Sequence, residues 1–74
     1  MLIEVFGPGC AKCEMLLKHA REAAAGGDHE VVKISDYAAM AARGILSTPA
    51  LAVDGELKSQ GRVLAAADIQ AFLK

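Results

Sequence analysis

The chain has 74 residues, of which 54% are apolar and 23% charged, and its formal net charge at pH 7 is −1. This length allows one small domain, and the high apolar content excludes a disordered chain. Because acids and bases are interspersed with no run of one sign, the charge pattern argues against binding to nucleic acid or to an anionic membrane.

The start of the chain has neither a basic segment nor an apolar run of signal-peptide length, so we expect no targeting peptide. The longest uncharged stretch, residues 44–53, is too short to span a bilayer. We therefore expect a cytoplasmic protein. In that reducing compartment, two cysteines spaced Cys-x-x-Cys indicate redox chemistry or metal binding rather than a permanent structural disulfide.

The first half of the chain predicts strand, helix, strand and helix. Residues 1–6 are largely apolar and are stopped by Gly7-Pro8-Gly9, which indicates a short strand and a turn. A period of 3.6 residues then predicts a helix over about residues 10–25, ended by two glycines. A second strand follows over residues 31–34, and Ser35 or Asp36 is expected to cap a short helix over residues 37–43.

The second half predicts a hairpin and a last helix. Pro49 can occupy only the first position or the edge of a strand, so a strand is expected over residues 50–53. Asp54-Gly55 is the strongest hairpin signal in the chain and predicts an antiparallel strand over about residues 56–60. The apolar spacing beyond Gly61 predicts a helix over about residues 64–74.

The predicted order is therefore β-α-β-α-β-β-α. A right-handed crossover makes the first two strands parallel neighbours, while the hairpin adds an antiparallel pair. The sequence thus predicts an α/β fold in one domain over residues 1–74, with a four-stranded mixed sheet flanked by three helices.

Cys10 lies where the first strand gives way to the first helix. The unpaired amides and the dipole at a helix start favour negative charge, so the Cys10 thiolate is expected to be stabilised, with Lys12 adding to the effect. Cys13 is expected to be more buried. We therefore predict that Cys10 is the nucleophile of disulfide exchange and Cys13 the resolving cysteine. Gly9 is either a plain loop residue or one that lets a substrate backbone approach Cys10.

A strand, a Cys-x-x-Cys that opens a helix, Thr48-Pro49 at the head of a later strand, a hairpin and a terminal helix together resemble the thioredoxin fold in its smallest form. The sequence is similar in particular to the small glutaredoxin-like thioredoxins known as redox-active disulfide proteins. This resemblance implies that Pro49 is a cis-proline facing the cysteines and that the backbone of Thr48 pairs with the substrate chain.

The resemblance also implies a function. It implies a thiol-disulfide oxidoreductase or electron carrier that reduces a disulfide-containing protein substrate and is itself reduced by an upstream reductase. The expected redox group is the Cys10–Cys13 disulfide, with no other cofactor, no metal and no membrane or nucleic-acid partner, and the expected state is a monomer. No aromatic residue precedes Cys10, and Ala11-Lys12 differs from the usual dipeptides of thioredoxins and glutaredoxins, so the redox potential and the use of glutathione stay open.

Binding of a soft metal is the alternative, because small copper-handling domains also place Gly-x-x-Cys-x-x-Cys between a strand and a helix, and paired thiolates bind Cu(I) well. Those domains end in a strand and usually have Met two residues before the first cysteine, where this chain has Pro8. Thr48-Pro49 also has no role in a copper site. For the other candidate ligands we expect solvated histidines, His19 and His29, and half-buried or core methionines, Met15 and Met40.

Overall fold

The computed structural model describes residues 1–9 and 11–73. Its elements follow the predicted order β-α-β-α-β-β-α, and the four strands form one mixed sheet with three helices, which confirms the predicted fold class. In chain order the elements are β1 (Leu2–Phe6), α1 (Ala11–Ala24), β2 (Glu30–Ile34), α2 (Tyr37–Ala42), β3 (Ala50–Val53), β4 (Glu56–Gln60) and α3 (Ala66–Phe72).

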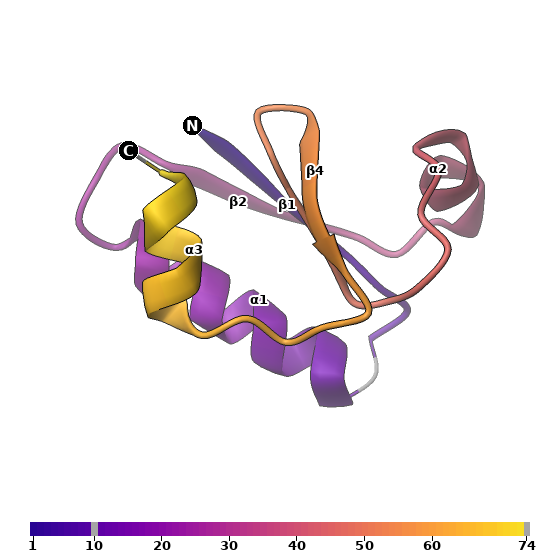
Figure 1. Cartoon of the computed structure of the whole chain (residues 1–74), viewed down its shortest axis with the longest axis horizontal. Helices are drawn as coiled ribbons and strands as arrows, with labels where there is room; N and C mark the ends of the chain where they lie inside the picture. The colour runs from indigo at the N-terminus through magenta and orange to yellow at the C-terminus, as the bar shows by residue number, and fades with distance from the viewer. Residues whose placement is uncertain (10, 74) are drawn as a thin grey trace.

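The strands lie in the order β2-β1-β3-β4. β1 and β2 are parallel, as predicted, and end together with Phe6 opposite Ile34. β3 runs antiparallel to β1, so Ala50 at its start lies opposite Phe6, and Gln60 at the end of β4 lies opposite Ala50. We call the end of the sheet formed by these four residues the motif end, because Gly7 leads from it toward the two cysteines. The start of β1 and the end of α3 lie at the opposite end (Figure 1).

The predicted hairpin is confirmed. Asp54 and Gly55 both have positive φ, 51° and 84°, as the two central residues of a type I′ turn require. The Asp54 carboxylate also accepts a hydrogen bond of 2.7 Å from the backbone N–H of Leu2. This bond ties the hairpin to β1, at the end of the sheet opposite the motif end.

The main core lies between the sheet and the pair α1 and α3, which pack against each other at a steep angle (Figure 1). Alternation along β1 turns Ile3 and Val5 toward these helices. The 3.6-residue period that predicts α1 corresponds to an apolar face of Cys13, Leu16, Leu17, Ala20 and Ala24, and all five are buried. The buried residues of this core are Ile3, Val5, Leu16, Leu17, Ala20, Ala23, Ala24, Leu51, Leu64 and Ile69.

A second, smaller core lies on the other face of the sheet, beneath α2, and contains Phe6, Met40, Ile45, Ala50 and Ala52. The N-terminus of α2 is capped as predicted, because the Asp36 carboxylate accepts a hydrogen bond of 2.9 Å from Ala38 N–H.

The Glu4 side chain in β1 is only 13% exposed, because it pairs with Arg43. Both of its carboxylate oxygens lie 3.2 Å from Nη1 of Arg43, whose guanidinium also lies 5.2 Å from the centroid of the Phe6 ring. The Arg43 side chain further donates to the Gly55 carbonyl at 3.2 Å. One arginine therefore links β1, the hairpin turn and the end of α2.

Three expectations need correction. The last helix begins at Ala66, two residues later than predicted, and Asp68 accepts a hydrogen bond from Ala65 N–H just ahead of it. His19 is half-buried rather than solvated: its Nδ1 lies 2.8 Å from the Leu64 carbonyl oxygen, which can only accept, so Nδ1 carries the proton. Met15 is 51% exposed and belongs to neither core cluster.

Candidate functional site

Cys13 lies in the first turn of α1 and is only 2% exposed. Its neighbour is Gly7, which follows β1 and is itself buried. A Cβ at Gly7 would lie 2.9 Å from Cys13 Cβ and closer still to Sγ. Gly7 is also fixed in place, because its N–H donates to the Ile34 carbonyl at 2.9 Å. A side chain on Gly7 would therefore occupy the space of the Cys13 thiol.

Thr48 and Pro49 meet the motif end from the β3 side. The peptide bond between them is cis, and Pro49 is less than 2% exposed. Pro49 precedes Ala50, which pairs with Phe6, just as Gly7 follows Phe6, so the fold brings Pro49 and Gly7 to neighbouring strand ends. Thr48 is exposed, and no group in residues 1–9 or 11–73 forms a hydrogen bond with its backbone N–H or C=O.

Two positively charged residues lie near the motif. Lys12 is exposed on the first turn of α1. Lys33 of β2 was not among the predicted site residues. Gly9, the residue before Cys10, has a φ of +94°, and a Cβ on Gly9 would lie 3.7 Å from Lys33 Nζ. The same Nζ donates a hydrogen bond of 2.8 Å to Oε1 of Glu14, the residue after Cys13. An ion pair between β2 and α1 therefore lies beside the Cys-x-x-Cys segment.

The hydrogen bond from Lys33 and then its charge lower the pKa of the Glu14 carboxyl below its usual value. A carboxyl whose pKa is lowered by folding stabilises the folded state at pH values above its pKa in the unfolded chain. It loses that contribution as the pH falls through its pKa in the folded state. Both partners are largely exposed, so salt should weaken the pair.

We therefore expect Glu14→Gln to lower the free energy of unfolding at neutral pH, with the difference from wild type vanishing in acid. Urea unfolding at about pH 7 and about pH 3, in low and high salt, measures this. Glu22→Gln is the matched control, since Glu22 lies on the same helix and forms no ion pair among the described residues. A difference from wild type that is as large in acid as at neutral pH would contradict the expectation.

Cys10, the predicted nucleophile, lies outside the described residues. Of the other predicted site residues, Gly9, Lys12 and Cys13 lie on the segment between β1 and the first turn of α1. Thr48 and Pro49 lie at the start of β3, at the same end of the sheet.

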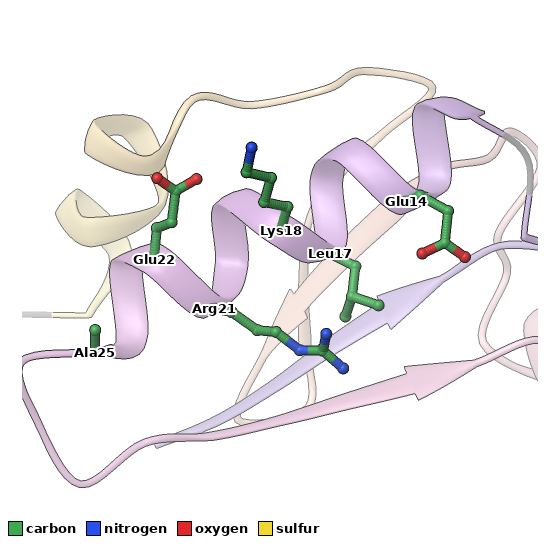
Figure 2. Close-up of a pocket in the computed structure, with 6 residues that line it drawn as sticks. All are labelled: Glu14, Leu17, Lys18, Arg21, Glu22 and Ala25. Carbon is green, nitrogen blue, oxygen red and sulfur yellow. The ribbon is translucent and has the colours of Figure 1, made fainter.

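A hollow of about 430 Å³ beside α1 is lined by Glu14, Leu17, Lys18, Arg21, Glu22 and Ala25. Arg21 and Leu17 point toward the sheet, and Lys18 and Glu22 point away from it (Figure 2). Five of the six residues come from α1 and Ala25 directly follows it, and the charged ones carry both signs. The lining includes neither Cys13 nor Thr48 nor Pro49, so this hollow beside α1 is not a cleft around the dithiol.

Within the part of the chain that the structure describes, no three side chains of His, Cys, Asp or Glu gather into a group able to hold a metal ion. A site formed by the two cysteines alone would include Cys10, which lies outside the described residues. No helix in the described ranges is both long and apolar enough to cross a membrane.

Two residues of this region escaped the sequence analysis. Lys33 lies opposite Val5 in the parallel register, and residues opposite each other point to the same face of a sheet, so it projects toward α1. The register of β1 and β2 would have revealed it. Gln60 was read only as the end of a strand, although its side chain binds the backbone ahead of Thr48. No local sequence pattern predicts a hydrogen bond between a strand side chain and the backbone of a distant loop.

The comparisons with known proteins agree with this architecture. A family described as a thioredoxin domain matches residues 1–74. The chain is 45% identical over 75 residues to a protein called thioredoxin from Methanothermobacter thermautotrophicus, covering 99% of this chain and 97% of that protein. It is 30% identical over 76 residues to a thioredoxin of Methanocaldococcus jannaschii, covering 100% of this chain and 87% of that protein. With its fold, its full-length family match and these relatives, the chain belongs to the thioredoxin family.

Proposed function

We propose that this protein is a thiol-disulfide oxidoreductase that carries electrons to disulfides in partner proteins through Cys10 and Cys13. The observation that carries the proposal is the neighbourhood of Cys13 at the motif end: a buried thiol against Gly7, with Thr48 and Pro49 at the next strand end, in a chain of the thioredoxin family. Each of these features has a use in disulfide exchange.

The proposed reaction has two exchange steps. The Cys10 thiolate attacks one sulfur of the substrate disulfide, a Cys10–substrate disulfide forms, and the other substrate sulfur leaves as a thiolate that takes up a proton. The Cys13 thiolate then attacks Cys10 Sγ, the mixed disulfide breaks, and the second substrate sulfur leaves. The substrate gains two electrons and two protons, and the protein is left with a Cys10–Cys13 disulfide. A dithiol reductase upstream returns it to the reduced state.

The surroundings of Cys13 support its role as the resolving cysteine. A thiol that is 2% exposed is shielded from external disulfides, yet it is only three residues from Cys10 along the chain. Burial therefore favours attack within the molecule over attack on a substrate. Because Cys10 directly precedes α1, the free amides of the first turn would favour its thiolate, with Lys12 and Lys33 as neighbouring positive charges.

The state of Thr48 supports its role in substrate binding. Thr48 is an exposed residue whose backbone N–H and C=O have no hydrogen-bond partner within residues 1–9 and 11–73, so an extended substrate segment can pair with them as an added strand. The buried Pro49 ring closes the motif end beneath that strand. The redox group is the dithiol itself, so the reaction needs no further cofactor, and a reducing cytoplasm suits it.

A redox titration against glutathione and dithiothreitol tests the proposal, together with a Cu(I) competition on the reduced protein. We expect one two-electron transition at roughly −200 to −300 mV, the range of dithiol carriers, and catalysed reduction of insulin disulfides. Tight retention of Cu(I) without disulfide turnover would overturn the proposal in favour of a soft-metal binding module.

A further inference from the structure

We propose that Leu46 selects the substrate by contacting an apolar side chain beside its disulfide, and that Gln60 is the positioning residue that holds Leu46 there. The inference rests on the proposed function and adds the class of substrate: disulfides flanked by apolar residues. It starts from an unusual side chain. Leu46 is 92% exposed, ahead of Tyr37 at 68% and Met15 at 51%.

An exposed leucine on a loose loop would need no explanation, but this segment is held firmly. The backbone N–H groups of Leu46 and Ser47 both donate to Oε1 of Gln60, at 2.8 and 3.2 Å. Two N–H donors require an oxygen, so the orientation of the Gln60 amide follows from its partners. One half-buried side chain thus fixes two consecutive residues ahead of Thr48.

The other side of Thr48 is fixed as well. Gly61 N–H donates to the Pro49 carbonyl at 2.8 Å, and a Cβ on Gly61 would lie 3.1 Å from Ser47 Cβ, so the segment packs closely on the end of β4. Ile45, next to Leu46, is buried in the smaller core and so attaches the segment to the sheet. Leu46 is therefore presented to solvent by a backbone that is already ordered, which lowers the entropy cost of binding.

The location of Leu46 relates it to the substrate. It precedes Thr48 by two residues, a span of at most about 7 Å along the chain, so it reaches the residues next to a disulfide held at Thr48. The three most exposed large apolar side chains of the described residues, Met15, Tyr37 and Leu46, all lie on segments that begin or end at the motif end. Met1 and Leu2, which are less exposed, lie at the opposite end.

The test compares two disulfide-bonded peptides that differ only in the residue beside one cysteine, leucine in one and aspartate in the other. The wild-type protein is expected to have a kcat/KM about tenfold higher for the leucine peptide, mainly because of a lower KM. Partial burial of a leucine side chain is enough to give a preference of this size. Leu46→Ser is expected to abolish this preference. Leu2→Ser, which removes a leucine from the other end of the sheet, is the matched control and should retain it.

Gln60 is tested by a pair of variants. Gln60→Met keeps the size but loses the acceptor, so the preference should fall as it does in Leu46→Ser, again through KM. Gln60→Glu keeps an oxygen for both N–H groups and should restore the preference. An unchanged preference in Leu46→Ser, or a Gln60→Glu variant no better than Gln60→Met, would overturn the inference. Failure of the wild-type protein to reduce even 2-hydroxyethyl disulfide would instead overturn the proposed function, and the inference with it.

Discussion

Replacement of Cys13 by serine is expected to stop turnover and to trap the protein on its substrate. Without the second thiol, the Cys10–substrate disulfide has no internal attacker and accumulates, and insulin reduction falls roughly 100-fold or more. Serine differs from cysteine by one atom, so the packing against Gly7 is nearly preserved. Mass spectrometry of the reaction quenched with acid measures the adduct, which dithiothreitol should release.

Cys10→Ser is the matched control for this experiment. It removes the proposed attacking sulfur, so it should be equally inactive but should form no adduct, because Cys13 is only 2% exposed. The pair of variants therefore separates the two roles. An adduct that forms on Cys13 in the Cys10→Ser protein, and at the wild-type rate, would reverse the assignment of nucleophile and resolving cysteine.

Most elements of this fold are predictable because local sequence chemistry determines where they end or turn. Gly7-Pro8-Gly9 ends β1, Asp36 caps α2, and the Asp54-Gly55 turn sets the antiparallel pairing of β3 and β4. The last helix was predicted two residues too long at its start. Leu64 has the apolar spacing of the helix, but its carbonyl accepts a hydrogen bond from His19 of α1. Apolar periodicity within one segment cannot predict such a contact between two elements.

The residues of the site were predictable from local motifs, but their contacts with residues distant in sequence were not. Cys13 and Pro49 were found from motif positions. The contacts that surround them join residues distant in sequence, such as Lys33 to Glu14 and Gln60 to Leu46. Each depends on the strand register, which decides the face on which a side chain emerges and the neighbour it meets. Glu4 shows the same limit: no local pattern in β1 indicates that Nη1 of Arg43, 39 residues away, lies 3.2 Å from its carboxylate.

The contact between Gly7 and Cys13 leads to the second large prediction. A methyl group at position 7 would lie 2.9 Å from Cys13 Cβ and nearer to Sγ, so Gly7→Ala must displace the thiol or the strand end. Gly7 cannot easily move, because its N–H is bonded to Ile34. We expect the free energy of unfolding to fall by about 1–3 kcal/mol, the usual cost of overpacking. Urea unfolding of the reduced protein measures this.

The same substitution should impair catalysis, because resolution requires Cys13 to reach Cys10. A displacement of the thiol by about 1 Å can slow such a step by up to about 100-fold, so the mixed disulfide should persist longer in Gly7→Ala than in wild type. Stability and resolution should therefore fall together, although the substitution touches neither sulfur covalently.

Two other glycines provide controls for Gly7→Ala. An added Cβ at Gly26 meets no atom within 4 Å, so Gly26→Ala should be close to wild type in stability. Gly44 also has open space but a φ of +73°, so Gly44→Ala reports the cost of backbone strain alone. Cys13→Ala in the Gly7→Ala background removes Sγ, the closest atom, and should recover part of the lost stability. If Gly7→Ala were as stable as Gly26→Ala, the close packing of Gly7 on Cys13 would be wrong.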